Sequence, residues 1–171
     1  MTVHATAFIV SYITDFIEHF FLNSYRYTFN SHKIIVEKKV DTFLFGSKSP
    51  FDKLCLQVVT EFKKKHHHIR RIYVRAEFPY IDEDYTAYLL EMYDHTYYPE
   101  RMINAGRAAY VERNYEMIDN SSYCVIYYDE NYMPPRRKNS RRDLFHYQPS
   151  SGTKLAYDYA VKKVLKVINV I

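Results

Sequence analysis

VDTFLFGSKSPFDKLCLQVVTEFKKKH (residues 40–66) contains the change from strand to helix that decides the fold. Its first seven residues are β-rich and end in a glycine, which favours a strand followed by a tight turn. From residue 49 to residue 66 the apolar side chains recur with helical spacing, at Phe51, Leu54, Cys55, Val58, Val59 and Phe62. The stretch therefore predicts a strand, a tight turn and a helix.

The same alternation continues toward the carboxyl end of the chain. Further strands are predicted at residues 70–76, 123–129 and 166–171, and helices at residues 83–93, 108–122 and 151–165. Strands that alternate with helices pair in parallel through right-handed crossovers. We therefore expect an α/β fold, a Rossmann-like three-layer α/β/α domain with a mainly parallel sheet, and the 171 residues suit a single domain covering residues 1–171.

The amino-terminal segment, residues 1–39, is the atypical part of the pattern. We expect it to be largely helical, although residues 5–13 can be interpreted as a strand or as a helix, so the first strand is atypical or missing. A missing strand would leave an exposed sheet edge that a homodimer would cover. With Asp15, Glu18 and His19, the segment is too charged for a membrane span or a clean signal peptide.

Charge and cysteine content restrict the class of protein only loosely. The net charge of +4 permits an anionic ligand or nucleic acid and requires neither. Cys55 and Cys124 lie in patterns typical of a buried helix face and a buried strand, without a neighbour at metal-ligand spacing. A reduced, cytoplasmic protein is the simplest expectation. The histidine run at residues 66–68 is interpreted as a favourable helix end, and no metal site is predicted.

Two serine-containing turns are candidate anion sites, because ligands of open parallel sheets bind beyond the carboxyl ends of the strands. The first, at residues 45–52, offers Gly46, Ser47 and Ser49 at a helix start. The second, at residues 149–153, offers Ser150, Ser151, Gly152 and Thr153. Ordinary helix caps explain either turn equally well.

The connection at residues 129–151 is much longer than a usual strand-to-helix loop. It holds several cations above the second serine turn, namely Arg136, Arg137, Lys138, Arg141 and Arg142. Guanidinium groups bind phosphates through paired hydrogen bonds, so the segment is interpreted as a lid or as a solvated basic loop.

YVERNYEMIDNSSYCVIYYDE (residues 110–130) and SGTKLAYDYAVKKVLKVINV (residues 151–170) resemble the SLOG superfamily. This Rossmann-like group includes DprA-like DNA-processing proteins, LOG phosphoribohydrolases and YpsA-like proteins, and the similarity is closest to short YpsA-like members. It covers roughly residues 40–171. The resemblance implies a bacterial protein that binds a nucleotide or a nucleotide-derived ligand near Ser-Gly-Thr.

The sequence departs from the enzymes of that group at the reacting residues. Arg113 matches the arginine that LOG enzymes use, but Ser150 and Ser151 replace a glycine pair, and Ala156 stands where those enzymes have a glutamate. Alanine cannot transfer a proton. The Gly-His turn that usually follows the first strand of YpsA-like members is also absent from this sequence.

Three functional hypotheses follow. The first is a module that binds or senses a nucleotide-derived anion, with no cofactor predicted, and its pocket comprises Gly46, Ser47, Ser49, Arg113, Ser150, Ser151, Gly152 and Thr153. The second is a hydrolase that cleaves the N-glycosidic bond of a nucleotide or an ADP-ribose-like compound. Arg113 would act there with Glu112 or Glu116, although both glutamates also suit ion pairs along a helix. The third is single-stranded nucleic-acid binding through the basic loop.

Overall fold

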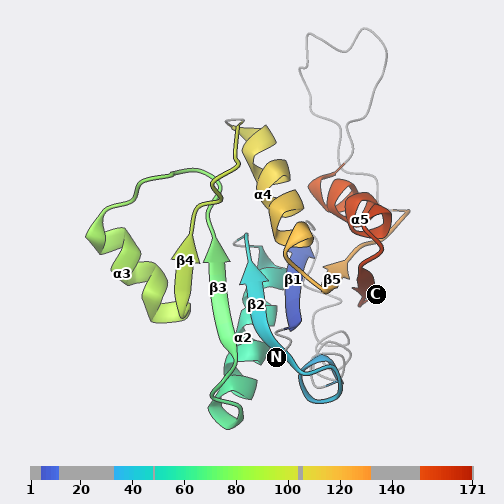
Figure 1. Ribbon diagram of the computed structural model, residues 1–171, viewed down its shortest axis with the longest axis horizontal. Coiled ribbons are helices and arrows are strands. Elements are labelled where there is room, and N and C mark those ends of the chain that lie inside the picture. Colours follow the sequence, from blue (N-terminus) through green and yellow to red (C-terminus); the bar gives the residue numbers. More distant parts are fainter. Residues whose placement is uncertain (1–4, 12–32, 48, 104–105, 132–150, 171) are drawn as a thin grey trace, which may run out of the picture.

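The computed structural model describes residues 5–11, 33–47, 49–103, 106–131 and 151–170, which fold into a three-layer α/β/α arrangement (Figure 1). Six parallel strands form one sheet in the order β4-β3-β2-β1-β5-β6. The strands are β1 (Ala5–Ser11), β2 (Val40–Phe45), β3 (Arg70–Val74), β4 (His95–Tyr97), β5 (Tyr123–Tyr127) and β6 (Lys166–Asn169). The helices are the π-helix η1 (Lys33–Glu37), α2 (Pro50–Lys65), α3 (Glu83–Met92), α4 (Arg107–Asp119) and α5 (Gly152–Lys162).

The predicted parallel α/β fold is confirmed, and the burial of β5 shows why its sequence is continuously apolar. All five residues of β5 are buried. Tyr123, Val125 and Tyr127 belong to the core cluster that includes residues of α2. Cys124 and Ile126 belong to the second cluster, with residues of α4 and α5. Because helices cover both faces of the sheet, neither side of this strand can be polar.

Of the two alternatives for the first strand, atypical or missing, the structure shows that the strand is present. Residues 5–11 form β1, which pairs in parallel with β2 on one side and β5 on the other. Ala7 and Ile9 alternate into the core, with exposed fractions of 0% and 1%. Because strands pair with it on both sides, this apolar segment is a strand and not a helix. Its atypical feature is a register irregularity between Ala5 and Thr6.

The argument for a covering homodimer loses its premise, because β1 closes the middle of the sheet. The rest of the segment expected to be helical, residues 1–4 and 12–32, lies outside the described residues, whereas Lys33–Glu37 forms η1. Among the helices that the structure describes, none is both long and apolar enough to cross a membrane.

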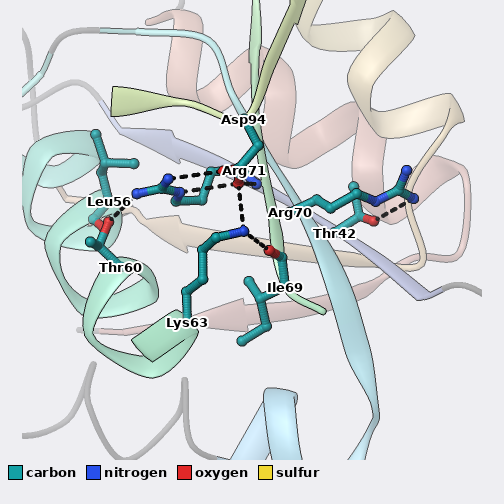
Figure 2. Close-up of polar contacts among 8 residues, drawn as sticks. All are labelled: Thr42, Leu56, Thr60, Lys63, Ile69, Arg70, Arg71 and Asp94. Atoms are coloured by element: carbon teal, nitrogen blue, oxygen red, sulfur yellow. Dashed lines mark hydrogen bonds and ion pairs between the residues drawn. The ribbon is translucent and has the colours of Figure 1, made fainter. Parts of the chain in front are cut away.

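Ion pairs and hydrogen bonds join α2, β3 and β4 at the amino ends of these two strands (Figure 2). Asp94 accepts hydrogen bonds from the backbone nitrogen of Arg71 at 2.8 Å and from its Nε and Nη2 atoms at 3.2 and 3.0 Å. Lys63 of α2 adds an ion pair to Asp94 at 3.2 Å, and Arg71 also donates to Thr60 at 3.0 Å. We call Asp94, Arg71, Lys63 and Thr60 the Asp94 cluster; it holds the end of α2 against β3 and the start of β4.

Candidate functional site

A cleft of about 240 Å³ opens beyond the carboxyl ends of β2 and β3. Its floor comes from the ends of these strands, and its walls come from the loop before α3, from α3 itself and from α4. The lining residues are Gly46, Ser47, Tyr73, Arg75, Ala76, Glu77, Phe78, Ile81, Tyr85, Tyr110 and Arg113. The cleft therefore brings together three of the residues predicted from the sequence, Gly46, Ser47 and Arg113.

Arg113 is the charged group at the base of this cleft, and its side chain is only 3% exposed. Its Nη1 donates to the backbone carbonyls of Gly46 and, at 3.4 Å, Val74, and its Nε donates to Asn114 Oδ1 at 3.1 Å. These acceptors are all neutral, and Arg113 forms no ion pair with any carboxylate of the described residues. Burial lowers the pKa of Arg113, although nearby Tyr73 and Asp52 act in the opposite direction.

The approach of Arg113 explains the glycine at position 46. A Cβ atom at this position would lie 2.7 Å from both Cζ and Nε of Arg113. No side chain fits there without moving the guanidinium. Gly46 therefore permits the close contact between the end of β2 and the arginine of α4.

Ser47 and Ser49 both bond to a carboxylate that the sequence interpretation did not identify. Their hydroxyls donate to Asp52 Oδ2, and the Ser49 Oγ accepts from the backbone nitrogen of Asp52 at 3.1 Å as the cap of α2. The Ser-x-x-acid pattern of a capping box is the signal that could have indicated Asp52. Because Ser49 bonds to Asp52 through both its hydroxyl and its cap contact and does not line the cleft, the ordinary cap is the better interpretation of Ser49.

Asp52 is itself deeply buried, with an exposed fraction of 2%. Burial raises its pKa, while the hydrogen bonds from Ser47 and Ser49 and the charge of Arg113 act in the opposite direction. The Asp52 carboxyl group thus lies near the Arg113 guanidinium without forming an ion pair with it. It positions Ser47, which faces the cleft.

Arg75 is a second guanidinium in the cleft that the sequence interpretation missed. Its Nη1 donates to the carbonyls of Phe78 and Pro79 at 3.0 and 3.2 Å, which fixes the loop that follows β3. Its Nε is buried and has no hydrogen-bond partner among the described residues. Burial lowers the pKa of Arg75. No motif marks such a residue, because its role depends on how the loop folds back over the strand end.

The start of α5 is a separate place on the same edge of the sheet. Ser151 caps the helix, and its Oγ accepts from the backbone nitrogen of Lys154 at 3.1 Å. Gly152 is exposed with open space at its missing Cβ, whereas Thr153 is 3% exposed and its Oγ1 has no partner. Because α5 follows β5, and β5 is two strand positions from β2, about 10 Å separates the ends of those strands.

Other predicted residues fall outside the described part of the chain or away from the cleft. Ser150 and the lid arginines, Arg136, Arg137, Arg141 and Arg142, lie outside the described residues. Ala156 is buried in the core with α4.

Neither candidate catalytic glutamate lines the cleft. Glu112 accepts from the backbone nitrogen of Ile103 at 2.9 Å, and Glu116 accepts from the Tyr97 hydroxyl at 3.1 Å. Burial raises the pKa of Glu116. Among the described residues, Glu77 is the only carboxylate that lines the cleft, so an acid for bond cleavage would have to come from there.

Comparisons with known proteins do not show a family for this chain. No protein-family model matches the chain, and a search of curated proteins gives no significant match. The SLOG resemblance therefore stays a prediction.

Within the described residues, no group of three or more His, Cys, Asp or Glu side chains is arranged to hold a metal ion. The fold and the site together define a Rossmann-like α/β protein with a cationic cleft at the carboxyl edge of its sheet.

Proposed function

We propose that this protein binds a nucleotide-derived anionic ligand at the carboxyl edge of the sheet. The observation that carries the proposal is the Arg113 guanidinium, which is almost completely buried, faces the cleft and, among the described residues, bonds only to neutral acceptors. Asp52 and Glu77 lie near enough to raise the pKa of Arg113, but neither forms an ion pair with it. A phosphate group that enters the cleft would form the charge-assisted hydrogen bonds that Arg113 lacks with these carboxyl groups.

Two further features favour this edge for a phosphorylated ligand. Open parallel sheets bind ligands beyond their carboxyl ends, where Gly46, Ser47 and Arg113 meet. The start of α5 offers a second place for a phosphate, because Gly152 is open to approach and the Thr153 hydroxyl has no partner. An extended ligand would be needed to contact both places.

The proposal is tested by calorimetric titration with nucleoside monophosphates, cyclic nucleotides, ADP-ribose and NAD. We expect saturable binding of at least one compound, weakened about 30-fold or more in Arg113→Gln, because removing a buried charged partner costs about 2 kcal/mol or more. Arg70→Gln is the matched control. It removes the same charge from an exposed arginine that bonds to Thr42 at the opposite strand end. Equal loss in both variants, or no binding of any compound, would refute the proposal.

Product analysis of the same samples separates a binding module from a hydrolase. We expect the bound compound to be recovered intact, because Glu112 and Glu116 are bonded elsewhere and Ala156 has no acid group. Release of a free base that stops in Glu77→Gln would instead establish the hydrolase.

A further inference from the structure

The walls of the cleft are aromatic, and they come from separate parts of the chain. Tyr73 belongs to β3, Phe78 to the loop after it, Tyr85 to α3 and Tyr110 to α4. From this arrangement, and resting on the proposed function, we infer that the cleft binds the flat ring of a nucleobase, so that the ligand is a mononucleotide rather than a phosphorylated sugar.

The exposure of these rings indicates an uncovered binding surface. Phe78 is 57% exposed and Tyr110 is 38% exposed, so both present apolar area to water at the cleft. Tyr73, by contrast, already packs against Tyr93 with ring centroids 5.1 Å apart. A flat ring bound between the exposed side chains would remove their surface from water and stack on it, which every base can do.

The loop that carries Phe78 is held in place by a neighbouring arginine. Arg75 bonds to the backbone carbonyls of Phe78 and Pro79. A loop whose backbone is already held loses less conformational freedom when a ligand binds. These bonds therefore favour binding at the loop that presents Phe78 to the cleft.

The positive charge of Arg113 lies beside the Tyr110 ring. The Cζ of Arg113 is 5.5 Å from the centre of the Tyr110 ring, within the range of a cation–π interaction. A ligand that fills the cleft therefore needs a flat group and an anionic group only a few ångströms apart. A nucleoside monophosphate carries both, whereas a phosphorylated sugar lacks the ring and a nucleoside lacks the charge.

The size of the cleft limits how much of a ligand can enter. Its volume of about 240 Å³ is below the roughly 300–1,000 Å³ of pockets that enclose drug-sized molecules. One base with its sugar suits that space better than two nucleosides. A dinucleotide would have to leave its second half outside the cleft.

The test is a calorimetric comparison of AMP, GMP, CMP and UMP with adenosine and ribose 5-phosphate, using the full chain. We expect at least one nucleotide to bind more tightly than both fragments. Tyr110→Ala should weaken that nucleotide about 5- to 100-fold, because stacking contributes about 1–3 kcal/mol per base. It should weaken ribose 5-phosphate less, because the Tyr110 ring contacts the Arg113 guanidinium but would not stack on a sugar. Tyr110→Phe keeps the ring and should bind nearly as well as the natural protein.

Tyr80→Ala is the matched control, because Tyr80 is 92% exposed and does not line the cleft. Ribose 5-phosphate binding as tightly as the nucleotides, or a nucleotide affinity unchanged in Tyr110→Ala, would overturn the base-binding inference while leaving the proposed anion site intact. If no phosphorylated compound binds, both the inference and the proposed function fail.

Discussion

Arg113 and Arg71 show how differently one fold can treat the same side chain. Arg71, at the amino end of β3, forms paired hydrogen bonds with Asp94 in a cluster that also contains Lys63 (Figure 2). Arg113, at the carboxyl edge, is more deeply buried and bonds only to uncharged acceptors among the described residues. Arg71 joins three elements, whereas Arg113 is a buried positive charge that forms no ion pair within the part of the chain that the structure describes. We interpret that difference as the difference between a structural site and a binding site.

The largest expected effect is the loss of ligand affinity when Arg113, but not Arg71, is replaced. Arg113→Met should abolish measurable nucleotide binding and should also lower the unfolding free energy, because the buried carbonyls of Gly46 and Val74 lose their donor. Arg71→Met should leave affinity unchanged and lower stability by about 1 kcal/mol or more, because Asp94 loses its paired partner. Calorimetric titration and urea unfolding of both variants measure the contrast. The interpretation fails if Arg71→Met is the variant that loses binding.

A smaller effect on affinity should follow from moving Arg113 without replacing it. Gly46→Ala places a Cβ 2.7 Å from the guanidinium, which must shift away from its position in the cleft. We expect nucleotide affinity to fall about tenfold, equivalent to about 1.4 kcal/mol. With a mononucleotide, which would not extend from the cleft to the start of α5, Gly152→Ala is the control for the substitution itself, because nothing lies within 4 Å of the added atom. Unchanged affinity in Gly46→Ala would show that the position of Arg113 is unimportant.

The Asp94 cluster should control stability in acid. Burial alone would raise the pKa of Asp94, but hydrogen bonds and charge from Arg71 and Lys63 lower it to about 2 from its ordinary value of 3.8. The resulting stabilisation is present above pH 4 and is lost as the pH falls from 4 through 2. Asp94→Asn should cost about 1 kcal/mol at pH 7, after allowing for partial exposure, and much less at pH 2. Urea unfolding monitored by circular dichroism at both pH values gives the comparison.

Asp52 should show a pH dependence of the opposite sign. Because burial raises its pKa in the folded state, its contribution to stability is greatest when it is protonated and declines as the pH rises from about 4 through the raised pKa. In Asp52→Asn this decline should disappear. Thermal unfolding of both proteins from pH 4 to pH 7 measures it. A steeper decline in the variant would show that the charged form is the stabilising one.

The smallest expected effect concerns the start of α5. Gly152→Ala should raise the unfolding free energy by up to about 0.5 kcal/mol, because alanine loses less backbone freedom on folding and nothing obstructs its side chain. Urea unfolding measures this change.

Gly152→Glu tests the proposed second phosphate position. It should weaken an extended ligand such as NAD more than a mononucleotide, and equal weakening would place both ligands at the same turn.

Much of the fold could be predicted because helical and strand periodicities are local properties of the sequence. The segments from residue 40 onward alternate clearly, and β2 and α2 begin and end within one residue of the predicted limits. β1 was ambiguous because a short apolar segment suits a strand and a helix equally. Only its pairing with β2 and β5, which comes from distant parts of the chain, identifies it as a strand.

The candidate site was predictable only in part, for a related reason. Gly46, Ser47 and Arg113 were indicated by turn chemistry and by the family resemblance, and the structure brings them together. Arg75, Phe78 and Tyr110 have no local signal, because they become neighbours only when β3 and α4 pack at one sheet edge. Asp52 has the local signal of a capping box, but its bond with Ser47 and its burial depend on how the folded turn packs.

The most direct test of the central claim follows the Nε–H signals of the two arginines by nuclear magnetic resonance while a nucleoside monophosphate is added. The account predicts that the Arg113 signal shifts saturably, with the dissociation constant that calorimetry gives, and that the Arg71 signal stays in place. A nucleotide that binds without moving the Arg113 signal would contradict the account, because the buried arginine would then have no role in holding the anion.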